Sequence, residues 1–281
     1  MLYYKQMAEL LFGTAGIPHG AWPLTTIDGI KRIAELGLGC MEIEFVQGIY
    51  LNEEEAHLVA ETAVNSGVKL SAHAPYFLNF NSHEPRKIRA SQGILHKAAR
   101  MATMCGAQSV VFHAGFYLGD PPEKVYQTVK RYLAEVIDRL KEEDIQLSLR
   151  PEASGKGSQF GSIEEILKLC TELEGIAPAI DFAHWHARTG GFNSYKEFAY
   201  VLEQTKQRLG STALDNMHIH ISGIAYGPKG EIRHLDLKNS DLNYVDLLRA
   251  LKDYRVKGLV ICESPSQEDD TRLLRDSYHD L

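Results

Sequence analysis

The chain has 281 residues, of which 44% are hydrophobic and 24% are charged, so it can bury a sizeable core without disulfides or other staples. Its formal net charge of −7 argues against a broad nucleic-acid-binding surface. The negative charge does not exclude a local basic track, or a metal site that offsets the charge of phosphates.

Short apolar runs alternate with longer helical patterns along the chain. Strands are predicted at residues 10–14, 40–46, 68–74, 107–115, 145–152, 176–182, 216–222 and 257–264. Helices are predicted at residues 25–37, 52–67, 84–106, 122–144, 162–173, 194–210, 244–254 and 268–278. Each strand is followed by a helix, and this order implies an α/β fold with a parallel sheet. Eight such units at this length predict a (β/α)₈ TIM barrel, with residues 1–281 as a single domain.

The rival fold is a doubly wound open sheet. The nucleotide-binding form of that fold carries a G-x-G-x-x-G turn after its first strand, and this sequence has none there. The loop SGKGS (154–158) also lacks the spacing of a phosphate-binding P-loop. We therefore expect a barrel without a nucleotide cofactor.

The cysteines and the N-terminal segment indicate the cellular setting. The four cysteines lie far apart, form no C-x-x-C pair, and each sits in or beside an apolar segment: Cys40, Cys105, Cys170 and Cys262. Lys5 and Glu9 interrupt the first segment, so neither a signal peptide nor a membrane span fits it. We expect a cytoplasmic protein with reduced, buried thiols and no membrane partner.

The carboxyl ends of the third to eighth predicted strands each carry an imidazole or a carboxylate. These residues are His73, His113, Glu152, Asp181, His218 and Glu263, and His184 follows three residues after Asp181. Each alone has an ordinary explanation, such as a hydrogen-bonded histidine or a helix-capping acid. Chemistry in a TIM barrel collects at this end of the strands, and unrelated causes at six successive ends are rare. Imidazole and carboxylate together bind Zn²⁺, Mn²⁺ or Fe²⁺, so the pattern predicts a metal site.

The seventh predicted strand, NMHIHIS (216–222), carries two histidines of the same parity. His218 and His220 point to one face, one pleat repeat apart, while the apolar residues between them point to the other. The polar face is expected to line the barrel interior. The deeper of the two histidines can equally be a core residue or a support for a ligand.

Six segments, in order, resemble the endonuclease IV family of abasic-site endonucleases, which belongs to the xylose-isomerase-like barrels. They are HAPYFLN (73–79), VFHAGFYLG (111–119), PEASGKG (151–157), IDFAHWHARTGG (180–191), MHIHIS (217–222) and ICESP (261–265). The resemblance extends over about residues 10–275. It implies a hydrolase with three metal ions, usually zinc, that cuts the DNA backbone 5′ to abasic sites in base excision repair.

The resemblance also implies roles for individual residues. The first ion would be bound by His73, His113 and Glu152, and the second by Glu152, Asp181, His218 and Glu263. Glu152 would bridge the two ions and be central to catalysis, and His184 and His234 would help to bind the third. Tyr76 and Asn79 would contact the DNA, and Lys156 can meet a phosphate just beyond Glu152. We expect two to three divalent transition-metal ions, zinc first and Mn²⁺ or Fe²⁺ as alternatives, and abasic DNA as the partner.

The sequence departs from the family in two places. Ile232 stands where an Asp-Arg-His triplet supplies an acid to the third metal, and Glu231, one position earlier, can substitute for it. The loop VQGIYLN (46–52) lacks the arginine with which the family probes the DNA stack. We therefore expect the third metal either to be completed by Glu231 or to be bound more weakly than the other two, and we expect the DNA contacts of the 46–52 loop to differ from those of the family.

The main alternative is a single-metal sugar isomerase or epimerase of the same superfamily. Such an enzyme needs only the set Glu152, Asp181, His218 and Glu263. It does not require His73, His113 or His234, so these three histidines discriminate between the two functions. A metal-dependent binding protein without catalytic activity is a third interpretation.

Overall fold

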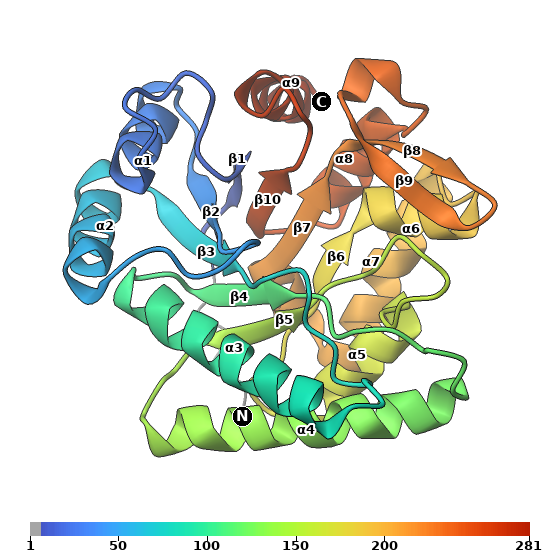
Figure 1. The fold of residues 1–281 in the computed structure, drawn as a ribbon. Helices are drawn as coiled ribbons and strands as arrows, with labels where there is room; N and C mark the ends of the chain where they lie inside the picture. The colour runs from blue at the N-terminus through green and yellow to red at the C-terminus, as the bar shows by residue number, and fades with distance from the viewer. Residues whose placement is uncertain (1–6) are drawn as a thin grey trace.

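Eight parallel strands form the centre of the fold in the computed structural model, which describes residues 7–281 (Figure 1). They are β1 (Leu10–Ala15), β2 (Cys40–Glu44), β3 (Lys69–His73), β4 (Ser109–Phe112), β5 (Ser148–Pro151), β6 (Ala179–Asp181), β7 (Met217–Ile221) and β10 (Gly258–Cys262). Their order in the sheet is β5-β4-β3-β2-β1-β10-β7-β6. The first six residues of the predicted domain, Lys5 among them, lie outside the described residues.

The sheet closes on itself between β5 and β6. Parallel bridges join Leu149 to Ile176 and Glu152 to Ala179, and the Ala153 amide donates to the Ala179 carbonyl at 3.0 Å. Closure removes the open edges that a flat sheet would leave. The predicted TIM barrel is therefore confirmed.

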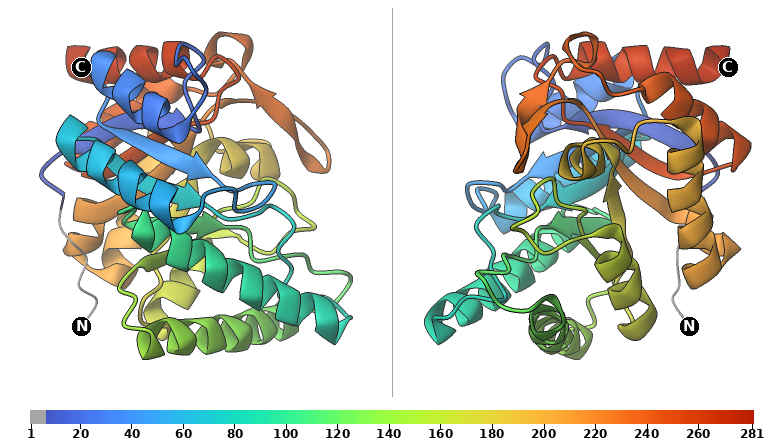
Figure 2. Two further views of the ribbon diagram at one scale, coloured as in Figure 1. Left: turned by 60° about the vertical axis from the view of Figure 1, so that its left-hand side comes forward. Right: turned by 90° about the vertical axis from the view of Figure 1, so that its right-hand side faces the viewer.

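Eight helices follow the barrel strands and cover the outside of the barrel (Figures 1 and 2). They are α1 (Thr26–Glu35), α2 (Glu53–Ser66), α3 (Pro85–Met104), α4 (Pro122–Glu142), α5 (Ile163–Glu172), α7 (Tyr195–Leu209), α8 (Tyr244–Asp253) and α9 (Glu268–Asp280). Capping boxes start α2, α5 and α7, where an Asn or Ser side chain and a Glu three residues later satisfy each other's backbone N–H groups. No helix within residues 7–281 is long and apolar enough to cross a membrane.

Alternate side chains along the strands point to two different regions, the apolar core cluster and the polar interior of the barrel. In β2, Met41 and Ile43 are buried in the core cluster, whereas Glu42 between them is buried beside histidines of β7. The same alternation places Ile219 of β7 in the core cluster. The four cysteines are buried and free, as expected.

Two elements at the mouth of the barrel were not predicted. A short helix, α6 (Phe182–Thr189), begins directly after β6 because the Asp181 side chain caps it by accepting the His184 N–H at 2.7 Å. The segment after β7, for which the sequence predicted neither a helix nor a strand, forms an antiparallel hairpin of β8 (Gly223–Gly227) and β9 (Gly230–Leu235). The hairpin docks on the loop after β5, where the Glu231 N–H donates to the Gly155 carbonyl at 2.9 Å.

The backbone at the start of β10 requires glycine. Gly258 has a φ of 129°, and an added Cβ would lie 2.0 Å from the Met217 carbonyl oxygen of β7. Gly258→Ala should therefore lower the free energy of unfolding by at least ~2 kcal/mol, because both backbone strain and a backbone clash oppose the methyl group. Urea denaturation followed by circular dichroism measures the change.

Gly191 is the matched control. It lies on the surface after α6, and an added Cβ would meet no atom within 4 Å. Gly191→Ala should change the free energy of unfolding by less than about 0.5 kcal/mol. Equal effects of the two substitutions would contradict the close approach of β10 to β7.

Candidate metal centre

The predicted strand-end residues meet at one mouth of the barrel. His73 ends β3 and Asp181 ends β6, whereas His113, Glu152 and Glu263 directly follow β4, β5 and β10. The strands are parallel, so their carboxyl ends lie on the same side. The candidate ligand atoms fall into groups within 4.8 Å of one another.

The first group consists of His73, His113 and Glu152. The Nε2 atoms of the two histidines lie 3.0 and 3.3 Å from Oε2 of Glu152. Nδ1 of His73 lies 2.8 Å from the Ala74 carbonyl oxygen, which can only accept, so the proton is on Nδ1. Its Nε2 therefore presents a lone pair to a carboxylate, and only a proton or a cation between the two atoms makes that contact favourable.

A proton meets this need in the metal-free protein. Burial alone would lower the pKa of His73, but the hydrogen bond with Glu152 and the negative charges of Glu152, Glu44 and Glu42 together outweigh burial and raise the pKa to about 10. Burial likewise opposes ionisation of Glu152, yet the imidazoles of His113 and His220 hold the pKa of this carboxyl well below its usual range. A divalent cation would replace the proton with a larger positive charge.

The second group consists of Glu152, Asp181, His220 and Glu263. Here the structure corrects the prediction, because His220 occupies the place that was assigned to His218. Strand β7 pairs with β6 so that His220 lies opposite Asp181, whereas His218 lies one pleat repeat deeper. Nδ1 of His220 is 3.3 Å from Oε1 of Glu152 and 3.2 Å from Oε1 of Glu263.

The third group consists of His184, His234 and Glu263, and Glu231 lies beside it. Nδ1 of His184 and Nδ1 of His234 lie 3.1 and 3.2 Å from the carbonyl oxygens of Ala153 and Glu263, so each ring carries its lone pair on Nε2. These Nε2 atoms are 3.1 Å apart. The carboxylate of Glu231 lies 3.7 Å from one and 4.0 Å from the other. Two lone pairs and a carboxylate converge, as the ligands of a divalent ion do.

The carboxyl groups of the second set are crowded. Burial raises the pKa of Asp181 well above its usual range, and the nearby Glu263 and Glu152 raise it further. Burial acts in the same direction on Glu263, but His220 and His234 together outweigh it and lower the pKa to about 2. Among residues 7–281, none of these three acids has an ion pair with lysine or arginine. The donor set therefore fits divalent cations, which would relieve the repulsion.

The three residues predicted to contact substrate, Tyr76, Asn79 and Lys156, lie in different surroundings. The Tyr76 side chain, on the loop after β3, is exposed and packs edge-on against Phe77. Oδ1 of Asn79 accepts the Asn81 N–H at 3.0 Å, so this side chain already has a role within its loop. Lys156 lies in the loop after Glu152, bridged to the β8–β9 hairpin at Gly230.

Sequence reasoning missed Glu42 and Glu44. Both belong to β2, whose sequence CMEIE alternates like that of β7, so the same parity argument would have placed them inside the barrel. Glu42 contacts His218 and His220 at 3.0 Å each. Burial raises the pKa of Glu44 to about 8.

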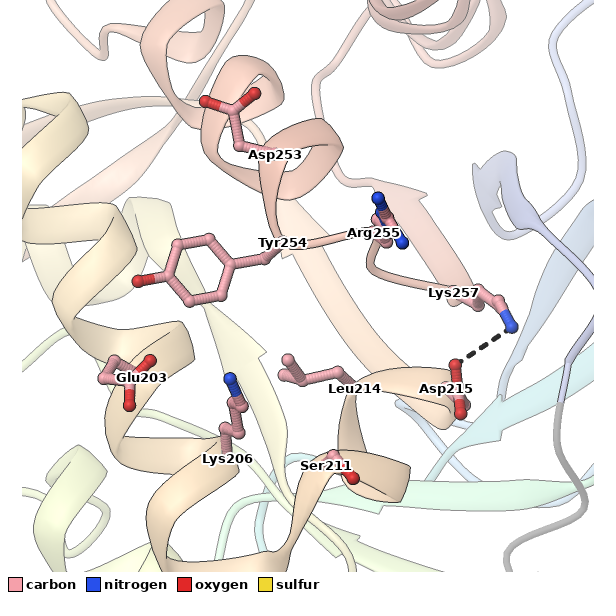
Figure 3. Close-up of a pocket in the computed structure, with 9 residues that line it drawn as sticks. All are labelled: Glu203, Lys206, Ser211, Leu214, Asp215, Asp253, Tyr254, Arg255 and Lys257. Atoms are coloured by element: carbon pink, nitrogen blue, oxygen red, sulfur yellow. Dashed lines mark ion pairs between the residues drawn. The ribbon is translucent and has the colours of Figure 1, made fainter.

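A cavity of about 620 Å³ lies at the opposite end of the barrel (Figure 3). It is enclosed by α7, α8 and the segments that precede β7 and β10, and Lys257 forms an ion pair with Asp215 at 3.0 Å on its wall. None of the predicted site residues lines it. The converging ligand atoms, not this cavity, mark the candidate centre.

Several known proteins resemble the chain in sequence. An uncharacterized protein of Methanocaldococcus jannaschii is 43% identical over 97% of this chain and 98% of its own length. A protein of Mycoplasma pneumoniae named "Probable endonuclease 4" is 24% identical, covering 76% of this chain and 74% of its own length. The predicted resemblance to endonuclease IV proteins is thereby confirmed.

Solved structures show the same fold. The crystal structure of endonuclease IV from Thermus thermophilus aligns with a TM-score of 0.76 at 18% identity, covering 96% of this chain and all of that one. A D-tagatose 3-epimerase-like protein aligns with a TM-score of 0.72 at 18% identity, covering 96% of this chain and 97% of that one. Residues 30–279 match the family described as "Xylose isomerase-like TIM barrel". The chain therefore belongs to the xylose isomerase-like TIM barrel family.

Proposed function

We propose that the protein is a metal-dependent phosphodiesterase that hydrolyses the DNA backbone 5′ to abasic sites. The observation that best supports this function is the extent of the ligand set. Beyond the four-residue group, His73 and His113 form a group with Glu152, and His184 and His234 form one with Glu263. A single-metal isomerase needs neither pair. The similarity to proteins named as endonuclease 4 agrees with this choice.

Glu152 would be the bridging ligand, because its two oxygens face different groups. Oε2 contacts His73 and His113, whereas Oε1 contacts His184 and His220 at 3.1 and 3.3 Å. Two to three divalent ions, zinc first and Mn²⁺ or Fe²⁺ as alternatives, would act as Lewis acids on water and on the scissile phosphate. The buried carboxylates and imidazoles hold the ions in place and exclude bulk water from the deeper part of the centre.

Glu231 would complete the third ligand group in place of the missing aspartate. Within the hairpin, Tyr226 pairs with Glu231 and Ala225 with Arg233, so Ile232 is an extra residue in a β-bulge. Residues three apart on a regular strand face opposite sides, but the bulge brings Glu231 to the side of His234. The Ile232 side chain points to solvent instead, with 67% of its surface exposed.

The exposed aromatic residues beside the centre fit a nucleic-acid substrate. Tyr76 and Phe77 are 63% and 50% exposed and offer faces on which unpaired bases can stack. Lys156, close to the hairpin, can meet a backbone phosphate. Because Asn79 is engaged within the loop, we assign it to ordering the Tyr76 segment instead of touching DNA.

A sugar isomerase or epimerase is the second candidate. The group of Glu152, Asp181, His220 and Glu263 could serve one ion on its own, and the fold is shared with an epimerase-like protein. The two functions differ in the number of ions that they need and in the substrate that they turn over.

The number of bound ions is the first measurement. Elemental analysis of the purified protein, together with anomalous diffraction, should find at least two transition-metal ions per chain, both within reach of Glu152. The reason is that Glu152 presents its two oxygens to separate ligand groups. A single, fully occupied site would favour the epimerase.

Cleavage of a DNA duplex with one abasic site is the direct assay. The metal-loaded protein should cut it on the 5′ side, and Glu152→Gln should slow the cut by roughly 10³-fold or more, because it removes the shared negative charge. Glu164→Gln, an exposed position on α5, is the control and should retain full activity. Near-normal cleavage by metal-loaded Glu152→Gln would rule out the bridging role, and turnover of ketoses without DNA cleavage would establish the alternative.

Removal of Glu231 tests the third ligand group. Glu231→Ala should weaken binding of the third ion by at least about tenfold and slow cleavage, while the first two ions remain bound. Loss of this carboxylate leaves the two imidazoles with Glu263, whose negative charge is shared with the second group, so the remaining set would hold a divalent ion less firmly. Arg233→Ala, on the exposed part of the same hairpin, is the control for metal content. An unchanged third ion in Glu231→Ala would show that other groups hold it.

A further inference from the structure

A second cluster lies inside the barrel, beneath the candidate metal centre. It consists of Glu42 from β2 and His218 and His220 from β7, with exposed fractions of 0%, 1% and 0%. Only His220 belongs to a ligand group at the mouth. The other two residues have no role in the function proposed above.

Three polar groups converge on the Glu42 carboxylate. Nε2 of His220 lies 3.0 Å from Oε1, and Nε2 of His218 lies 3.0 Å from Oε2. The Ser71 hydroxyl donates to the same Oε2 at 2.7 Å. An ionised carboxylate only accepts hydrogen bonds, so the contact of His220 with Oε1 is favourable when Nε2 of His220 carries a proton, which Nε2 of His218, 3.1 Å away, can also accept.

The proton on Nε2 of His220 decides what its other nitrogen can do. Nδ1 faces Glu152 and Glu263 at 3.3 and 3.2 Å, which is the place of the second ion. A neutral imidazole with its proton on Nε2 has its lone pair on Nδ1, where a metal can bind. The opposite tautomer would direct an N–H group at the ion.

Stability alone does not account for Glu42. Among residues 7–281, its ion-pair partners are the two imidazoles, and no lysine or arginine compensates for its burial. Replacing a buried charged group of this kind with an apolar side chain is often neutral or stabilising. A carboxylate that fixes the tautomer of a ligand histidine and raises its basicity, by contrast, is a common support of metal sites.

We propose that Glu42 is a positioning residue that holds His220 in its Nε2–H tautomer and thereby strengthens binding of the second ion. His218 lies 3.0 Å from the other oxygen and holds the carboxylate in its orientation. This assignment rests on the metal centre of the proposed function but not on its DNA substrate. It differs from the alternative that Glu42, His218 and His220 bind an ion of their own.

The test is the zinc affinity of the full-length Glu42→Gln protein, measured by competition with a chelator. Binding of the second ion should weaken by about 10- to 100-fold while the first ion is unaffected. Glu42→Asp keeps the charge, but its side chain is one methylene shorter and so lies further from His220. Its second-ion affinity should lie between those of Glu42→Gln and the wild type. This variant replaces Glu42→Gln in the test if Glu42→Gln does not fold. Ser71→Ala is the matched control, because it removes a donor to Oε2 and leaves the His220 contact intact. Its second-ion affinity should stay close to that of the wild type.

Nuclear magnetic resonance of the zinc-loaded protein with ¹⁵N-labelled histidine reads the tautomer directly. His220 should carry its proton on Nε2 and be coordinated through Nδ1. An unchanged second-ion affinity in folded Glu42→Gln, or a wild-type protein that binds no second ion, would overturn the proposal. Anomalous density for zinc between Glu42, His218 and His220 would also overturn it. If Glu42→Gln weakens the second ion in a protein that does not cut abasic DNA, the positioning role stands and the proposed function fails.

Discussion

A buried carboxylate stays ionised only when positive charge lies close to it, and the mouth of this barrel is built around that constraint. Glu152 is surrounded by imidazoles on both of its oxygens, and its neighbours Asp181 and Glu263 add negative charge beside it. Protons on the histidines balance this charge in the metal-free protein, as the raised pKa of His73 indicates. Divalent ions would balance it more strongly. The strands, the short helix α6 and the hairpin all serve to bring these few groups within contact distance.

Most of the fold could be predicted because it depends on simple periodicities. Eight apolar runs alternate with eight helical patterns, and the strands and helices of the barrel follow them closely. Except for the first, the predicted strands are longer than the observed ones, because the prediction included flanking residues such as His113 that belong to the loops. Helix α6 was missed because its cap, Asp181, is also a candidate ligand, and the sequence does not separate the two roles.

The sequence alone could not decide whether His218 or His220 belongs to the second ligand group. Parity places both imidazoles inside the barrel, but only the register between β6 and β7 determines which one reaches the level of Asp181. Register depends on how neighbouring strands are offset around the whole barrel, so no local pattern contains it. Glu42, in contrast, could have been found, because the alternation of β2 is as clear as that of β7.

The bulge at Ile232 has a consequence for comparing sequences in this family. One additional residue in the hairpin changes which side chains face the barrel. As a result, the carboxylate near His184 and His234 belongs to Glu231, which in a sequence alignment lies one position before the expected site at Ile232. An alignment that scores each column separately would record a missing acid at Ile232, although the Glu231 carboxylate lies beside the two histidines. Relatives with an apolar residue before Arg-His should therefore be compared in space, with the neighbouring acid included, before their third site is counted as degenerate.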